Sequence, residues 1–219
     1  MISLNLPTRL RVLCLAAHCD DIEIGCGATL LSWAEQGTAI DATWFVAAAG
    51  GPRGDEQRAS AERYFARFES GRLELGDFPD AAFPTVYAPI KQRLVELAQQ
   101  VRPDLIFTHR LEDRHQDHRL IGELTWNVWR DSLVLEYEIP KWEGDLDRAA
   151  VLVPVSEAAL RSKLDWLGEC HRSQRSKDWF DPELFRGLAR LRGAECRSPS
   201  RWAEGFHARK LTIGAGQVT

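Results

Sequence analysis

The pattern of apolar positions alternates between two periods along the first 130 residues. Apolar runs typical of strands occur at 10–17, 41–50, 71–76 and 104–109. Segments with the period of amphipathic helices separate them, at 28–37, 56–69, 88–103 and 118–131. Strands and helices that alternate at this length predict βαβ units, and therefore a mostly parallel sheet with helices on both faces.

The rest of the chain is less regular. Strands are expected at 133–140 and 150–156, and helices at 157–175 and 181–193. No repeat, low-complexity segment or linker interrupts the sequence, so we expect one domain over residues 1–219.

Composition narrows the class of protein. The content of 44% hydrophobic and 27% charged residues is that of an ordinary globular chain, and the net charge of −4 argues against a nucleic-acid partner. No apolar run reaches the length of a membrane span, and the first apolar run ends in acids rather than in a signal-peptide cleavage site. Five cysteines without a CxxC pair predict reduced thiols in a cytoplasmic protein. A homo-oligomer remains possible.

Two polar clusters follow predicted strands. The first lies in AHCDDIEIGCG, where His18 is followed by Asp20, Asp21 and Glu23; the second is HRLEDRHQDH at 109–118. Ligands of open α/β sheets bind at the carboxyl ends of the strands, so we expect the two clusters to meet at one edge. Carboxylates this close repel one another and lose hydration when covered, and a bound cation would offset that cost.

The residue types in the clusters fit a zinc hydrolase. His18, Asp21 and His118 would supply three protein ligands and leave the fourth position to water, whose pKa zinc lowers towards 7. Asp20 does not bind the metal in this interpretation and would take the proton. His115, held by Asp117, would stay protonated and stabilise an oxyanion. The clusters therefore predict a metal-assisted amide or ester hydrolase.

Simpler interpretations exist for each feature. Asp117 could cap a helix, and the acids could form a solvated turn. Gly25 and Gly27 resemble part of a dinucleotide loop, but the third glycine is missing and the acids would repel a pyrophosphate. His109 is more simply an ordinary loop histidine. The placement of both clusters behind apolar strands favours the functional interpretation.

Several motifs also resemble one family. AHCDDIEIGCG resembles the (A/P)HPDDExxxGG motif of the PIG-L/LmbE-like zinc-dependent N-acetylglucosamine de-N-acetylases, and HQDH resembles their HPDH. Further along, GDEQRASAERYF resembles a segment near the substrate pocket, KLDWLGECHRSQ a K…HxSQ helix, and RWAEGF the terminal YAEGF. The resemblance implies a Rossmann-like three-layer α/β fold with the metal site at the carboxyl ends of the strands.

The resemblance also implies roles for single residues. One zinc ion per chain would be bound by His18, Asp21 and His118. Asp20 would be the general base, and His115 the oxyanion-stabilising acid with Asp117 as its partner. Arg58 would contact substrate.

The chain departs from the family pattern at two positions. Cys19 replaces the usual proline, which would otherwise fix φ in the metal loop, so a looser loop is expected. A thiolate at Cys19 is an alternative zinc ligand. Glu23 comes one residue later than the family's acid, so its usual role would be absent or differently met.

The predicted function is removal of the N-acetyl group from a GlcNAc-containing small molecule or glycoconjugate. The alternatives are an amidase on another acyl or thiol-conjugate amide, a non-catalytic metal- or sugar-binding protein, and a nucleotide-binding module. A His₂Asp set also accepts Fe²⁺, Co²⁺ or Mn²⁺. We expect residues 133–150 to set specificity, and Trp142 or Trp202 to stack on a sugar face.

Overall fold

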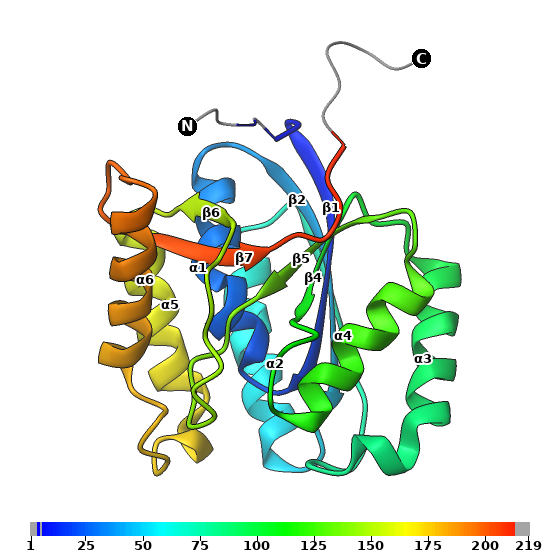
Figure 1. Cartoon of the computed structure of the whole chain (residues 1–219). Coiled ribbons are helices and arrows are strands. Elements are labelled where there is room, and N and C mark those ends of the chain that lie inside the picture. Colours follow the sequence, from blue (N-terminus) through cyan, green and yellow to red (C-terminus); the bar gives the residue numbers. More distant parts are fainter. Residues whose placement is uncertain (1–3, 5, 213–219) are drawn as a thin grey trace.

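The computed structural model describes residues 4 and 6–212 and contains one seven-stranded sheet in the order β3-β2-β1-β4-β5-β7-β6 (Figure 1). The strands are β1 (Arg9–His18), β2 (Ala39–Ala48), β3 (Ser70–Leu75), β4 (Leu105–His109), β5 (Leu133–Tyr137), β6 (Val151–Pro154) and β7 (Ala203–His207). Strands β1 to β5 run parallel to their neighbours, whereas β7 is antiparallel to both β5 and β6. The ends of the predicted domain, 1–3, 5 and 213–219, lie outside the described residues.

Helices cover both faces of the sheet. They are α1 (Asp21–Glu35), α2 (Pro52–Phe65), α3 (Tyr87–Gln100), α4 (Gln116–Val128), α5 (Glu157–Cys170) and α6 (Pro182–Glu195), with 3₁₀ turns η1 (Phe83–Val86) and η2 (Arg172–Gln174). Helices α3 and α4 lie on one side, and α1, α2, α5 and α6 on the other (Figure 1). This arrangement confirms the predicted three-layer α/β fold with a mostly parallel sheet.

Strand β1 lies at the centre of the sheet and faces a hydrophobic core on each side. Leu10, Val12, Cys14 and Ala16 belong to the core under α1 and α5, and Leu13, Leu15 and Ala17 to the core under α3 and α4. A parallel strand buried on both faces needs apolar residues at every position, which explains the unbroken run in the sequence.

Helix α1 begins earlier than the sequence predicted, at Asp21 instead of residue 28. Gly25 and Gly27 lie inside this helix, where they allow close packing. A Cβ at Gly27 would come within 2.5 Å of the Tyr64 hydroxyl, and one at Gly25 would collide with the ring of Tyr137. The two glycines therefore serve helix packing and form no phosphate loop.

The strand order reverses between β1 and β4, since β2 and β3 lie on one side of this pair and β5 on the other. Open sheets of this kind form their binding crevice where the order reverses. The end of β1 carries the first polar cluster and the end of β4 the second, so the topology brings the two clusters together as expected.

The five cysteines are all free. Among residues 4 and 6–212, no helix combines the length and apolar composition needed to cross a membrane.

Candidate active site

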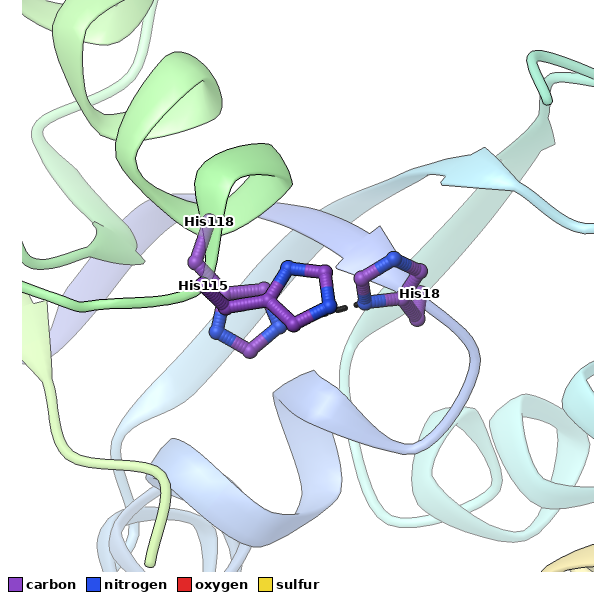
Figure 2. A group of neighbouring side chains, drawn as sticks. All are labelled: His18, His115 and His118. Atoms are coloured by element: carbon purple, nitrogen blue, oxygen red, sulfur yellow. Dashed lines mark hydrogen bonds between the residues drawn. The ribbon is translucent and has the colours of Figure 1, made fainter. Parts of the chain in front are cut away.

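Three predicted metal ligands meet where β1 ends and α4 begins. His18 is the last residue of β1, Asp21 the first of α1, and His118 lies in the first turn of α4. His18 Nδ1 lies 3.1 Å from His118 Nε2 and 3.7 Å from Asp21 Oδ2, and Asp21 Oδ1 lies 3.6 Å from His118 Nε2. Figure 2 shows the rings of His18 and His118 facing each other, with His115 beside them.

Carboxylates orient both of these rings. Asp113 Oδ2 lies 3.0 Å from His118 Nδ1, and Asp117 Oδ2 and Asp80 Oδ1 lie 3.1 and 3.0 Å from His18 Nε2. Each ring therefore pairs one nitrogen with a carboxylate and directs the other towards Asp21. Metal-binding histidines are commonly held in this way, and two imidazole nitrogens with a carboxylate form a donor set that zinc accepts. The residues present thus fit a bound metal ion.

Charges within the site are closely coupled. Burial disfavours a charged His18, but Asp117, Asp80 and Asp21 outweigh it and raise the pKa of His18 to about 10. Burial would raise the pKa of Asp21, yet the neighbouring His118, His109 and His18 hold that pKa below its ordinary value. The surrounding carboxylates therefore favour a proton on His18, and a cation that binds between His18 and Asp21 would displace that proton.

Asp20 occupies the N-cap position of α1 in the left-handed region, with φ of 92°. Such a backbone conformation costs on the order of 1–3 kcal/mol in a non-glycine residue and is found mainly at functional sites. Here it allows two consecutive carboxylates, Asp20 and Asp21, to line the same cleft. Asp20 Oδ2 is buried and accepts no hydrogen bond from the described residues, and the nearest positive charge is Arg53 Nη2 at 3.9 Å. Burial and then the charge of Asp21 raise the pKa of Asp20 to about 7, close to the value that suits a general base at neutral pH.

The carboxylate of Asp117 does not hold His115, contrary to the prediction. Asp117 accepts hydrogen bonds from the backbone N–H of Ala81 at 2.7 Å and of Phe83 at 3.0 Å, and it contacts His18. Its own backbone N–H donates to His115 Nδ1 at 3.3 Å, so His115 and not Asp117 is the N-cap of α4. Asp117 therefore orients a proposed metal ligand and secures the chain around η1.

His115 lacks the counter-charge that the sequence interpretation assumed. Burial, and then the positive charge of His18, lower the pKa of His115, which favours the neutral ring over the predicted protonated one. Because Nδ1 accepts the N–H of Asp117, the neutral ring carries its proton on Nε2. His115 lines the cleft, so this N–H can donate to a ligand there.

His109 belongs to the site and is not an ordinary loop histidine. It is the last residue of β4, fully buried, and its ring stacks on His118 with a centroid separation of 3.9 Å. Its Nε2 lies 3.1 Å from Asp21 Oδ2 and 3.0 Å from the backbone nitrogen of Ala17. Ligand atoms of Asp21, His109 and His118 lie within 4.8 Å of one another, as do those of His18, His115 and His118. The position of His109 at the end of a strand beside the reversal point was the signal that could have placed it here.

Sequence reasoning also missed Asp113 and its partner Lys141. Lys141 Nζ lies 2.9 Å from Asp113 and 3.2 Å from Asp145. Asp113 in turn contacts His118. The loop after β5 is thus tied by one ammonium group to the carboxylate that orients a proposed metal ligand.

Arg53, and not Arg58, is the arginine of α2 that lines the cleft. Its Nη2 donates to the carbonyl oxygen of Cys19 at 2.9 Å, and its Nη1 lies 3.2 Å from Asp80 Oδ2. Arg58 is exposed and does not line the cleft. Helix α2 begins at Pro52, so both arginines belong to it. Arg58 comes five residues after Arg53, which rotates its side chain by roughly 140° around the helix axis and points it away from the cleft.

Cys19 faces the core instead of the proposed metal. Its side chain is fully buried, and its Sγ lies 3.8 Å from the carbonyl oxygen of Ala48. Burial raises the pKa of the Cys19 thiol, which keeps it protonated. The structure therefore does not favour the alternative that Cys19 binds zinc.

Glu23 keeps a supporting role despite its shifted position in the motif. It is fully buried, and its Oε1 accepts hydrogen bonds from Gln57 Nε2 at 2.8 Å and Ser60 Oγ at 2.5 Å. His171 Nε2, at the end of α5, lies 3.3 Å from the same oxygen. Glu23 therefore joins α1 to α2 and to the HRSQ segment. His171 supports the site indirectly, through its contact with Glu23.

A cleft of about 520 Å³, open to solvent, extends from these residues. Its lining consists of His18, Asp20, Asp21, Arg53, Asp80, His115, His118, Ile139, Lys141, Trp142, Glu143, Gln174, Lys177 and Trp179. Four of these residues come from 133–150, the segment expected to set specificity. Trp142 is one of them, whereas Trp202 packs against the core under Arg186 and lies outside the cleft.

A family model agrees with this geometry. The model for the PIG-L family, described as GlcNAc-PI de-N-acetylase, matches residues 13–129, which is more than half of the chain and includes both polar clusters. The chain belongs to the PIG-L family. PIG-L proteins are metal-dependent deacetylases, and a deacetylase is an amide hydrolase.

Solved structures resemble this PIG-L protein in fold. N,N'-diacetylchitobiose deacetylase from Pyrococcus horikoshii superposes with a TM-score of 0.69 at 20% identity, covering 90% of this chain and 83% of its own. The A40926 pseudoaglycone deacetylase Dbv21 gives 0.69 at 18% identity, covering 90% and 96%. GalB, a 4-carboxy-2-hydroxymuconate hydratase from Pseudomonas putida, gives 0.71 at 18% identity, covering 95% and 100%. No curated protein matched the sequence.

Proposed function

We propose that this PIG-L protein hydrolyses the N-acetyl group of a GlcNAc-containing small molecule or glycoconjugate, releasing acetate and a free amino sugar. One observation carries the proposal. Nδ1 of His18 and Nε2 of His118 point to the same place beside Asp21. Oδ2 of Asp20, which accepts no hydrogen bond from the part of the chain that the structure describes and lies 3.9 Å from Arg53 Nη2, is in the same cleft. Metal ligands and a separate carboxylate base are the groups that amide hydrolysis at a metal centre requires.

We assign the metal to His18, Asp21 and His118, with one zinc ion per chain as the proposed occupant. Zinc supplies a Lewis acid for the amide carbonyl and lowers the pKa of water. Asp113 and Asp117 hold the two rings in position through their second nitrogens.

The protein's own groups then divide the proton transfers. Asp20 takes a proton from the attacking water through Oδ2 and returns it to the sugar nitrogen as the carbon–nitrogen bond breaks. The Nε2–H of neutral His115 donates to the carbonyl oxygen while negative charge develops there. Arg53, in place of Arg58, is the proposed substrate contact on α2, and Trp142 is the proposed contact for a sugar face.

The substrates of similar proteins support an amino-sugar substrate. N,N'-diacetylchitobiose and the A40926 pseudoaglycone are substrates of two proteins that share the fold. GalB shows that the same fold also carries a hydratase, so the fold alone does not determine the reaction. Asp20 and His115 are both present in the cleft, which counts against a protein that only binds metal or sugar. The free cysteines fit the reducing cytoplasm that we propose as its location.

Acetate release from a panel of N-acetylglucosaminides tests the proposal. The panel contains free GlcNAc, UDP-GlcNAc, GlcNAc-inositol, GlcNAc-malate and N,N'-diacetylchitobiose, each assayed with added zinc and with a chelator. We expect zinc-dependent acetate release from at least one compound, and loss of both bound metal and release in His118→Ala. Release that persists in chelator, or one tightly bound metal per chain without release from any compound, would contradict the proposed reaction.

A further inference from the structure

Two tryptophans stand at the mouth of the cleft. Trp142 follows β5 and Trp179 follows η2, so they come from separate loops, and both line the cleft that contains His18. Trp142 is 67% exposed, whereas His18 at the floor is 7% exposed. A large apolar ring exposed at the rim of a concave site is typical of a surface that a ligand covers.

The two rings are held in place before any ligand arrives. Trp142 Nε1 donates to Asp178 Oδ1 at 2.8 Å, and its ring meets Trp179 edge to face with centroids 6.2 Å apart. Trp179 packs edge to face on Phe180 at 5.8 Å, and Phe180 packs on Phe185 in the core. Trp142 and Trp179 together form an anchored aromatic platform, which loses little conformational entropy when a ligand binds.

The charges around the platform favour a neutral ligand. Lys177 Nζ lies 5.7 Å from the ring of Trp179, and the carboxylates of Glu143 and Asp178 lie on the same two loops. Lys141 and Arg53 are already paired with carboxylates. The mouth therefore offers aromatic surface and mixed charge instead of the cluster of free cations that a phosphate requires.

We propose that Trp142 and Trp179 form a subsite for a second ring joined to the acetamido sugar. This inference rests on the proposed deacetylase function and narrows its substrate class. The acetamido ring has to reach the floor of the cleft, so the ring next to it lies at the mouth, where its apolar face packs on the tryptophans. The preferred substrates are then disaccharides or glycosides with a ring-bearing aglycone, ahead of free GlcNAc and nucleotide-linked GlcNAc.

Steady-state kinetics test the preference. We expect kcat/KM for N,N'-diacetylchitobiose to exceed that for GlcNAc and UDP-GlcNAc. In Trp142→Ala and Trp179→Ala the ratio of kcat/KM between the disaccharide and GlcNAc should fall roughly 3- to 10-fold, mainly through KM, which is the scale of an aromatic contact. Trp142→Phe should retain most of the ratio, and Trp202→Phe, outside the cleft, should leave it unchanged. A preference for UDP-GlcNAc that depends on Lys177, or a ratio that neither alanine variant alters, would overturn the subsite.

A binding measurement separates this inference from the deacetylase function. Chitobiose, the two-ring sugar without acetyl groups, is titrated against the full chain while tryptophan fluorescence is recorded. Saturable quenching that Trp142→Ala removes supports the subsite, even if no compound releases acetate and the proposed function fails. Acetate release without any chitobiose-dependent quenching would leave the function standing and overturn the subsite.

Discussion

Two buried polar clusters touch helix α1, and they differ in how completely their charges are paired. The proposed catalytic cluster, made of His18, Asp20, Asp21 and the groups around them, lies at the first turn of the helix. The ion-pair cluster, made of Lys163, Glu204, Glu138 and Arg192, lies beside its middle. Both would be costly to bury if their charges stood alone.

In the ion-pair cluster every side-chain polar atom has a partner. Lys163 Nζ lies 2.6 Å from Glu204 Oε1 and donates to the carbonyl oxygen of Ile24 at 2.5 Å. Glu204 accepts the backbone N–H groups of Ala28 at 3.2 Å and Thr29 at 2.7 Å. Arg192 pairs in the same way with Glu138. The cluster thus binds helix groups that a regular helix would bond internally, and all of its charged side chains are already paired.

The proposed catalytic cluster retains polar atoms without hydrogen bonds. Asp20 Oδ2, Glu23 Oε2, His109 Nδ1 and His171 Nδ1 have no hydrogen-bond partner among the described residues. Asp20 in addition holds a left-handed backbone conformation. Buried charge alone therefore does not identify a functional site. The two clusters differ in that Asp20 presents to an open cleft a carboxylate oxygen without a hydrogen bond from any described residue.

The largest expected effect is on turnover in Asp20→Asn. The amide cannot accept the proton, so kcat should fall about 10²- to 10⁴-fold while the metal stays bound. Acetate release and metal content of the same preparation measure both quantities. Asp55→Asn, an exposed carboxylate on α2, is the matched control. A wild-type rate in Asp20→Asn would rule out this base.

In contrast to Asp20→Asn, which lowers turnover, Glu204→Ala should lower the stability of the folded protein. Removing the carboxylate leaves the buried ammonium of Lys163 without a counter-charge and two backbone N–H groups without their acceptor, so the free energy of unfolding should drop by about 3–5 kcal/mol. Urea denaturation measures this loss. The double variant Lys163→Met/Glu204→Gln keeps an acceptor for the helix without a buried charge and should recover most of it. The interpretation fails if the single variant is as stable as the parent.

Asp113→Asn should weaken metal binding by about 10- to 100-fold, because His118 loses the carboxylate that orients its ring. Competition with a chromophoric chelator gives the affinity. Asp41→Asn, which removes a surface carboxylate paired with Arg9, serves as the control. Equal affinities in the two variants would show that Asp113 does not support the metal.

The smallest effects distinguish two arginines of α2. Arg53→Ala should raise KM about tenfold, the scale of a lost hydrogen bond to a charged group, whereas Arg58→Ala should change KM less than about twofold. Kinetics on the best substrate of the panel compare them directly. The reverse order would restore the original assignment of Arg58.

The sequence predicted those features that depend on short-range pattern. The apolar run of β1 and its alternation with helical segments predicted the parallel sheet. The position of both polar clusters directly after strands predicted that His18, Asp21 and His118 lie close together. The contacts of individual side chains were harder to predict, because they depend on where each helix begins and where each loop turns. The early start of α2 puts Arg53 in the cleft in place of Arg58.

Partners distant in the sequence leave no local signal. Asp117 bonds to backbone groups of Ala81 and Phe83, over thirty residues away, so no spacing rule could have separated it from His115. Glu23 and His171 are 148 positions apart and meet only because α5 packs on α1. Such contacts follow from the assembled layers and not from the motif.

The hydrogen bonds from α1 to Glu204 have a consequence for folding during synthesis. A ribosome delivers His18, Asp21 and His118 long before β7 emerges, yet the middle of α1 obtains its last hydrogen-bond acceptor only from that strand. The nascent chain therefore contains all three proposed ligands while the helix that carries Asp21 still lacks the Glu204 carboxylate. Full ordering of the proposed metal centre then requires β7 to be synthesised and to pack beside α1.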